Sequence, residues 1–311
     1  MKVLVTCPPM LGMIDEFRPR FQDAGIEVVA PDVVQTLSVD ELKGLVPEHD
    51  AWIIGDDPAT REVFEAGKNG KLKAAVKWGI GVDNVDFDAC KELNIPITNT
   101  PNMFGAEVAD IATGYVIALA RETFEIDRSV RAGEWPKPCG ISLSNKTVAL
   151  IGFGDIGQNT AKRLMASGMK VLAYDPGMKQ TENFSNVEIL DWPNRIEEAD
   201  FIVITCSLTP SSHHMINTDT LTMAKNNVRI VNVGRGPVVD ENALIDALSK
   251  GKVYSAALDV FENEPLPMDS PLRKHPRCVF GSHNASNTSD GVVRTSNVAI
   301  DKLFDFLGIK E

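Results

Sequence analysis

The segment that most constrains the fold is a glycine-rich turn between an apolar strand and a helical stretch. The strand TVALI runs directly into GFGDIG, which places Gly152, Gly154 and Gly157 in the G-x-G-x-x-G spacing. The helix-compatible stretch QNTAKRLMASG follows, and a second strand then ends at Asp175. In dinucleotide-binding units the first glycine makes the tight turn, the second admits the pyrophosphate, and the third lets helix and strand approach. This context predicts a nucleotide site on a parallel α/β sheet.

The cofactor predicted for this turn is NAD. The phosphates would face unpaired N–H groups at the helix N-terminus, so the contacting residues are expected to be Gly152, Gly154, Asp155, Ile156 and Gly157. Asp175 can accept hydrogen bonds from ribose hydroxyls and would repel the 2′-phosphate of NADP. The following PGMK offers no arginine that would reverse this preference. The alternative is that Asp175 only caps a turn in YDPG.

Short β-branched runs alternate with longer amphipathic stretches through the chain, which is the pattern of crossover units on parallel sheets. At 311 residues, two domains are more plausible than one. The first hundred residues predict one doubly wound domain, with strands at KVLVT, IEVVA, AWIIG, LKAAVKW and PITN. A second α/β domain is predicted from the later strands TVALIG, KVLAYD, VEIL, FIVITC, VRIVNV, YSAALDV and CVFGS.

Two apolar helices are expected outside this alternation. Residues 103–121 have hardly any polar face, so this helix should be buried against its own sheet or against a partner subunit. After His283 the pattern suits a long terminal helix, with Ser286 or Thr288 as its N-cap. The segment Asn99 to Asn102 is predicted to cross between the domains.

Composition excludes several classes of function. The chain has 31 basic and 43 acidic residues and no basic run, which argues against nucleic acid as a partner. The N-terminal apolar stretch is too short for a signal peptide or a membrane span. The five cysteines are scattered and odd in number, which fits a reducing cytoplasm. Neither they nor the adjacent His213 and His214 have the spacing of a metal site, so no metal is expected.

Three chemically useful side chains follow strands in the second series. Arg235 stands between two glycines in IVNVGRGPVV, Glu264 lies in ENEPLP and His283 lies in GSHNAS. If these strands are parallel neighbours, all three residues lie on the edge that carries the glycine turn, where ligands bind in open α/β sheets. Each alone has a structural alternative, as a solvated surface charge or a satisfied polar residue. Together, beside a nucleotide fingerprint, they favour a catalytic site.

At these residues the chain resembles the D-isomer-specific 2-hydroxyacid dehydrogenases. The resemblance covers nearly the whole chain, in the order WGIGVDNVD, ITNTPN, GFGDIG, VNVGRGPVVDE, LDVFENEP and SHNAS. It implies a Rossmann NAD-binding domain, residues 101–284, inserted into a flavodoxin-like substrate-binding domain, residues 1–100 and 285–311. It also implies a likeness to phosphoglycerate dehydrogenase and to glycerate dehydrogenase, which is also called hydroxypyruvate reductase. A homodimer is expected from the resemblance and from the apolar helix near residues 103–121, which would form its interface.

The resemblance further implies the roles of individual residues. Arg235 would clamp the substrate carboxylate, His283 would exchange the proton, and Glu264 would orient the imidazole. Backbone N–H groups of Ile80 and Gly81 would contact the same carboxylate, and Asp259 would hold the nicotinamide carboxamide.

Some positions depart from common patterns in the family. Ser282 replaces the proline that many relatives carry before the histidine, and some branches share this serine. Asp56 and Asp57 stand where phosphoglycerate dehydrogenases commonly have an arginine, so an unphosphorylated substrate is favoured unless Arg61 swings in. The expected reaction is therefore reduction of a short 2-keto acid such as hydroxypyruvate or glyoxylate.

Two alternatives belong to other classes of protein. One is an NADH-binding regulatory scaffold of the same fold, although the chain offers no tails for docking partners. The other is a methyltransferase that uses the glycine turn, which would leave Arg235, Glu264 and His283 unexplained. Which hydroxy acid is used, the physiological direction and the pathway do not follow from the sequence.

Overall fold

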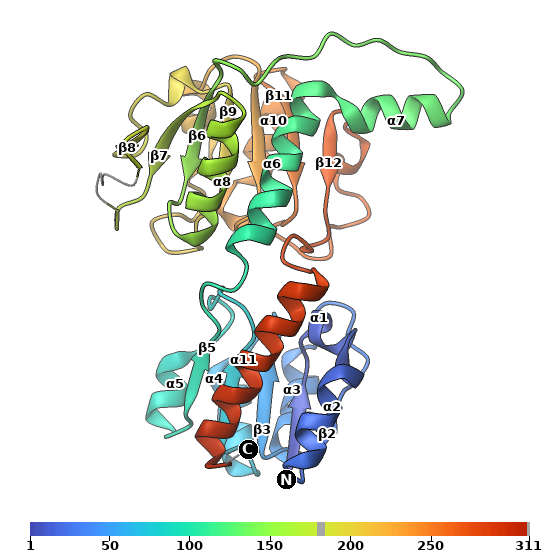
Figure 1. Ribbon diagram of the computed structural model, residues 1–311, viewed down its shortest axis with the longest axis vertical. Helices are drawn as coiled ribbons and strands as arrows, with labels where there is room; N and C mark the ends of the chain where they lie inside the picture. Colours follow the sequence, from blue (N-terminus) through green and yellow to red (C-terminus); the bar gives the residue numbers. More distant parts are fainter. Residues whose placement is uncertain (179–183, 310–311) are drawn as a thin grey trace. The chain divides into compact units, whose positions relative to one another are not determined.

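The computed structural model describes residues 1–178 and 184–309, and the chain divides into two compact units. One unit comprises Met1–Met103 with Asn287–Glu311, and the other comprises Phe104–Ser286. Each unit is built on its own parallel β-sheet (Figure 1). This confirms the α/β class predicted from the alternating strands and amphipathic stretches.

The first unit has five strands in the order β2-β1-β3-β4-β5, which is the flavodoxin-like order. Its strands are β1 (Lys2–Val5), β2 (Glu27–Val29), β3 (Ala51–Ile54), β4 (Ala74–Lys77) and β5 (Ile97–Asn99). Its helices are α1 (Pro8–Leu11), α2 (Ile14–Asp23), α3 (Val39–Leu45), α4 (Arg61–Asn69), α5 (Phe87–Glu92), α11 (Ser289–Leu307) and the 3₁₀ turn η1 (Val46–Glu48). The C-terminal α11 packs against β4 and α1, so the last helix completes a unit that begins at the N-terminus.

The core of this unit explains why its strands read as apolar runs. Every residue of β3 and β4 is buried, as expected for central strands of a parallel sheet that is covered on both faces. The rings of Trp52 and Phe64 lie 6.0 Å apart in the core. At the start of α11 the Thr288 side chain accepts a hydrogen bond from Gly291 N at 3.0 Å, so the N-cap is Thr288 and not Ser286.

The second unit has seven parallel strands in the order β12-β11-β10-β9-β6-β7-β8. The strands are β6 (Thr147–Ile151), β7 (Lys170–Tyr174), β8 (Val187–Leu190), β9 (Phe201–Ile204), β10 (Val228–Asn232), β11 (Val253–Leu258) and β12 (Cys278–Phe280). The helices are α6 (Gly105–Arg121), α7 (Thr123–Arg131), α8 (Asp155–Ala166), α9 (Thr218–Met223) and α10 (Glu241–Ser249), with the 3₁₀ turns η3 (Ile196–Glu198), η4 (Gly236–Val238) and η5 (Pro271–Lys274). The strand order is the dinucleotide-binding order extended by one strand.

Helix α6 is the apolar helix expected over residues 103–121. It packs against α8 and against strands β10 and β11 of its own unit, so burial against its own sheet is the alternative that the structure shows. Ile111 and Ile117 on this helix remain 37% and 42% exposed. All twelve strands expected from the sequence are present, which confirms two doubly wound sheets.

Within residues 1–178 and 184–309, no helix combines the length and the apolar character that crossing a bilayer requires.

Candidate active site

The candidate catalytic residues follow neighbouring strands of the seven-stranded sheet. Strand β11 pairs in parallel with both β10 and β12, and β9 separates β10 from β6. Arg235 follows β10, Glu264 follows β11, His283 follows β12, and the glycine turn follows β6. Because the strands are parallel, these four segments lie at the same carboxyl edge. The strand arrangement on which the catalytic prediction depended is therefore confirmed.

Glu264 and His283 meet directly at this edge. The Nδ1 atom of His283 lies 2.8 Å from Glu264 Oε2, and each side chain is 21% exposed. The other carboxylate oxygen of Glu264 accepts a hydrogen bond from Phe261 N at 2.9 Å. A carboxylate at Nδ1 orients the imidazole and favours its protonated form, so proton exchange with a ligand would run through Nε2.

The backbone around His283 is also constrained. His283 has a φ of 56°, a left-handed conformation that is uncommon for a residue with a side chain. Its N–H donates to Asp259 O at 2.7 Å, while the buried Asp259 carboxylate accepts from Asn284 N at 3.2 Å and Ala285 N at 2.9 Å. Burial raises the pKa of Asp259, and the two N–H donors partly oppose that rise. Asp259, predicted to contact nicotinamide, therefore also holds the histidine loop in place.

Arg235 lies in a loop whose shape depends on a buried polar residue. The Asn232 side chain donates to Arg235 O at 2.9 Å and accepts from Gly234 N at 3.0 Å. Asn232 is 1% exposed and ends β10. The Arg235 guanidinium donates to Gly234 O at 3.0 Å.

The two glycines beside Arg235 are required by close packing of the backbone. A Cβ on Gly234 would lie 2.6 Å from Cys206 O. A Cβ on Gly236 would lie 1.9 Å from the carbonyl carbon and oxygen of Phe261. The glycines are needed because the arginine loop packs directly against the backbone of its neighbours, including the segment that leads to Glu264.

The glycine turn has the geometry that its fingerprint predicts. Gly152 has a φ of 92° and would, with a Cβ, lie 2.6 Å from Cys206 N. A Cβ on Gly157 would lie 2.2 Å from Gly152 O, so this glycine lets α8 approach β6. A Cβ on Gly154 would meet nothing within 4 Å. This open space beside the first turn of α8 fits a pyrophosphate, because the helix N-terminus offers its N–H groups there.

Asp155 and Ile156 begin α8, where backbone N–H groups would face the phosphates. The Asp155 side chain points elsewhere: a Cβ on Gly105 of α6 would lie 2.3 Å from its carboxylate, and Asn159 Nδ2 donates to its Oδ1 at 3.1 Å. A contribution of Asp155 to cofactor binding would therefore come from its N–H group.

The structure shows the turn-capping interpretation of Asp175 directly, and ribose binding stays a prediction. Its Oδ1 accepts from Gly177 N at 2.8 Å, which is the turn-capping role. Its Oδ2 accepts from Phe153 N at 2.7 Å and so holds the carboxylate against the glycine turn, where a ribose would bind. The PGMK segment that follows ends at residue 179, which lies outside the described residues.

A second histidine–glutamate pair supports the loop that leads to Glu264. His214 Nε2 lies 2.7 Å from Glu262 Oε1, and Glu262 N donates to Glu241 Oε1 at 2.6 Å. Glu241 N in turn donates to Glu262 Oε1 at 3.3 Å. We call these three residues the Glu262 clamp. The clamp was not predicted from the sequence, because its three residues lie in separate segments of the chain.

Ile80 and Gly81 belong to the other unit, at the carboxyl edge of the five-stranded sheet. Gly79, which precedes them, has a φ of 111° and donates from its N–H to Thr100 Oγ1 at 2.7 Å. Asn99 Nδ2 donates to Ile80 O at 3.3 Å. Ile80 is 38% exposed, so its backbone lies in an accessible loop.

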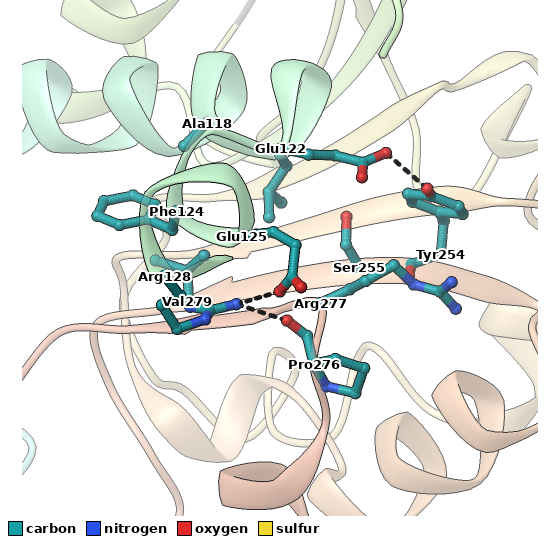
Figure 2. A pocket seen from close by; sticks show the side chains of 11 residues that line it. Ala118, Glu122, Phe124, Glu125, Arg128, Tyr254, Ser255, Pro276, Arg277 and Val279 are labelled. Carbon is teal, nitrogen blue, oxygen red and sulfur yellow. Dashed lines mark hydrogen bonds and ion pairs between the residues drawn. The ribbon is translucent and has the colours of Figure 1, made fainter. Parts of the chain in front are cut away.

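A separate hollow in the second unit lies at the opposite edge of its sheet (Figure 2). It is bounded by the end of α6, by α7, by the start of β11 and by the segment before β12. The Tyr254 hydroxyl donates to Glu122 Oε1 at 2.7 Å, and Arg128 donates to Glu125 Oε2 and Pro276 O at 2.7 Å each. This hollow is not the candidate active site, because the predicted catalytic residues all follow the carboxyl ends of their strands.

The fold and this edge define a class: an NAD-binding α/β protein with a histidine–carboxylate pair at the same sheet edge as the glycine turn. The profile of the D-isomer specific 2-hydroxyacid dehydrogenase, NAD binding domain, matches residues 113–285. The chain is 40% identical over 279 residues to a hydroxypyruvate reductase of Thermotoga maritima, covering 88% of this chain and 90% of that protein. It is 35% identical over 282 residues to a D-3-phosphoglycerate dehydrogenase of Methanocaldococcus jannaschii, covering 89% of this chain but 53% of that protein.

A solved structure gives the same result. A Thermus thermophilus protein superposes with a TM-score of 0.87 at 31% identity, covering 99% of this chain and 97% of that chain. The chain belongs to the D-isomer-specific 2-hydroxyacid dehydrogenase family. It is an NAD-dependent enzyme that interconverts a D-2-hydroxy acid and its 2-keto acid. This membership favours the dehydrogenase over the regulatory scaffold and the methyltransferase.

Proposed function

We propose that the enzyme reduces a short, unphosphorylated 2-keto acid such as hydroxypyruvate or glyoxylate. The observation that carries the catalytic part of this proposal is the 2.8 Å contact between His283 and Glu264 at the edge that also bears the glycine turn. The substrate choice is supported by the similarity to a hydroxypyruvate reductase over 90% of that protein's length.

The chemistry requires three functions from the protein. Arg235 binds the substrate carboxylate through charge-assisted hydrogen bonds. His283 donates a proton to the oxygen that becomes the hydroxyl group, and Glu264 stabilises the imidazolium form before that transfer. When bound, NADH supplies the hydride that reduces the carbonyl carbon.

The residues present fit NAD. Gly154 leaves open space where a pyrophosphate would approach, and α8 presents its N-terminus beside it. The Asp175 carboxylate lies against the same turn and would repel the 2′-phosphate of NADP. We propose that the unit formed by residues 104–286 holds the cofactor.

The direct test is NADH oxidation with a panel of 2-keto acids: glyoxylate, hydroxypyruvate, its 3-phosphorylated counterpart, pyruvate and a branched keto acid. We expect the highest kcat/KM with glyoxylate or hydroxypyruvate. A preference for the phosphorylated or the branched compound would contradict the proposed substrate.

We further propose that the enzyme is a cytoplasmic homodimer. The described cysteines are all free thiols, which suits a reducing compartment. Helix α7 has no buried residue, and Figure 1 shows α7 and the segment after it extending away from the sheet of their own unit. We call α7 together with residues 132–146 the arm. It exposes three apolar side chains: Phe124 is 45% exposed, Val130 is 42% exposed and Trp135 is 78% exposed. This exposure favours a protein partner that covers them.

A further inference from the structure

His214 connects two loops of the candidate active site that are separate in the sequence. It lies between β9 and α9 with a φ of 48°, a conformation that costs free energy for a residue with a side chain. Its backbone N–H donates to Pro237 O at 2.8 Å, in the loop that carries Arg235. Its ring Nε2 lies 2.7 Å from Glu262 Oε1, two residues before Glu264. One residue therefore contacts the first loop with its backbone and the second loop with its ring.

The segment around His214 pairs with the loop after β10 as a short parallel bridge. Ile216 N donates to Val238 O at 3.1 Å, and Asp240 N donates to Ile216 O at 2.9 Å. On the other side, His214 O accepts from the Nδ2 atom of Asn217, the N-cap of α9, at 3.0 Å. These hydrogen bonds hold the backbone of His214, so the direction of its ring is defined.

The other two members of the Glu262 clamp bind each other as well as the ring of His214. Glu262 Oε1 accepts from that ring, because an ionised carboxylate has no proton to donate, and also from Glu241 N at 3.3 Å. Glu262 N donates to Glu241 Oε1 at 2.6 Å. The side chains of His214 and Glu262 are both partly buried, which strengthens their hydrogen bond. Glu262 is therefore held through its carboxylate and through its backbone N–H.

The backbone next to Glu262 holds the carboxylate that contacts His283. Phe261 N donates to Glu264 Oε1 at 2.9 Å, and the other oxygen of this carboxylate lies 2.8 Å from His283 Nδ1. A shift of the backbone at Glu262 would move Phe261 N and, with it, the carboxylate of Glu264. Since a displacement of about 1 Å can reduce a rate by about 100-fold, the contact between His214 and Glu262 matters for the orientation of His283.

We propose that His214 is a positioning residue, which through Glu262 holds Glu264 in the orientation that stabilises the protonated imidazole of the catalytic histidine. It acts through the Glu264–His283 pair and not on the substrate itself. This inference rests on the proposed function, because it assumes that this pair supplies the proton. Loss of the ring contact should change the rate and the pH dependence of proton transfer, whereas binding of the keto acid by Arg235 should change little.

The test compares His214→Leu with His214→Gln, because only the glutamine keeps an N–H group that can donate to Glu262. In His214→Leu, kcat for NADH oxidation with hydroxypyruvate should fall about tenfold, while the KM for hydroxypyruvate stays within about threefold of wild type. Reduction of a keto acid needs a protonated His283, so kcat/KM falls as pH rises. In the leucine variant this fall should move about one pH unit lower, because Glu264 stabilises the imidazolium less well.

Rescue by the glutamine separates positioning from a general effect on stability. His214→Gln should keep the pH profile of wild type and a kcat within about threefold of it. The matched control is His213→Leu, the same substitution in the exposed neighbour, whose ring centroid lies 4.0 Å from that of His214. This control should leave kcat and the pH profile unchanged. The buried Asp259 carboxylate, which also acts on His283, accepts from Asn284 N and Ala285 N and stays in place in all three variants.

Melting temperatures establish that each variant is folded at the assay temperature. Equal losses of kcat in the leucine and glutamine variants, or an unshifted pH profile in His214→Leu, would overturn the inference while leaving the proposed function intact. If His283→Ala kept the turnover of wild type, the proposed roles of His283 and Glu264 would be wrong, and the inference with them.

Discussion

The Asp175 carboxylate accepts hydrogen bonds from the backbone and, in our proposal, from the ribose of the cofactor. It accepts N–H groups from the glycine turn and from its own turn at 2.7 and 2.8 Å, so its position is fixed before any ligand binds. Its charge then sets the cofactor preference, because a 2′-phosphate would have to approach a carboxylate that cannot move away.

Asp175→Asn should therefore relax the preference for NADH. The amide keeps one acceptor oxygen for the turn but removes the charge, so the ratio of kcat/KM for NADPH to that for NADH should rise about tenfold. The matched control is Asp191→Asn, which removes an exposed charge just after β8. Equal ratios in the Asp175 variant and in wild type would show that this carboxylate serves the turn alone.

The glycines show which contacts could be predicted from the sequence and which could not. The spacing of Gly152, Gly154 and Gly157 predicts a turn, and the close approach of Gly157 to Gly152 O is the local contact behind that spacing. The reason for Gly236 depends on Phe261, a residue distant in sequence whose backbone packs against it. Such a contact becomes visible only when the neighbouring loops are placed.

At the scale of elements, the loop after β10 that carries Arg235 packs directly against the loop after β11 that carries Glu264. Gly236→Ala would put a methyl group 1.9 Å from the Phe261 carbonyl, so the Glu264 loop would have to shift. We expect a loss of about 1–3 kcal/mol in unfolding free energy and a fall in kcat, measured by denaturant unfolding and steady-state kinetics.

Two other glycines provide the comparison. Gly44→Ala in α3, where a Cβ meets nothing, should be neutral or slightly stabilising. Gly154→Ala should keep wild-type stability but weaken NADH binding, because its methyl group would occupy the space proposed for the pyrophosphate. Wild-type stability and kcat in Gly236→Ala would contradict the close packing of these two loops.

The Glu262 clamp gives a prediction that depends on pH. Burial raises the pKa of Glu241, and the nearby charges of Glu262 and Glu264 add to the rise. In the folded protein this carboxyl group therefore loses its proton at higher pH than in the unfolded chain. Between these two pKa values the folded state binds more protons, so the contribution of Glu241 to stability falls as pH rises.

Glu241→Gln should remove this dependence while keeping an acceptor for Glu262 N. We expect the melting temperature of the variant, relative to wild type, to increase between pH 4 and pH 7, the range above the ordinary pKa of a glutamate. Measurements at several pH values check the slope. A difference that stays constant across this range would mean that Glu241 titrates alike in the folded and unfolded states.

Elements were more predictable than the contacts between them. All twelve strands could be predicted because a strand that is buried on both faces of a parallel sheet must be a short apolar run. The clamp could not be predicted in this way, since His214 lies in an irregular segment with a φ of 48° and no periodic pattern indicates its partner.

For the whole molecule, the arm formed by α7 and residues 132–146 is the feature that its own unit does not bury. We expect Phe124→Glu and Trp135→Glu together to convert a dimer into monomers, because charges would replace exposed apolar side chains. Analytical ultracentrifugation measures the change, and Glu134→Gln, beside Trp135, is the control. A dimer that persists in the double variant would place the interface elsewhere.

At the scale of the whole molecule, contacts between residues distant in sequence could not all be predicted. The sequence left open whether β11 and β12 are neighbours, and their parallel pairing brings Glu264 and His283 together although 19 residues separate them. In the other unit, the 3.0 Å ion pair between Lys77 and Asp56 joins the ends of β4 and β3. Motifs identified Glu264 and His283, whereas the pairing of Lys77 with Asp56 required coordinates.

The central claim is that His283, oriented by Glu264, donates the proton when the keto acid is reduced. The most direct measurement compares His283→Ala with wild type, using NADH oxidation under saturating keto acid and NADH affinity by fluorescence titration. We predict that kcat falls by about 10²–10⁴-fold while the Kd for NADH changes by less than about twofold. A kcat close to the wild-type value, or a parallel loss of NADH binding, would contradict the assigned role.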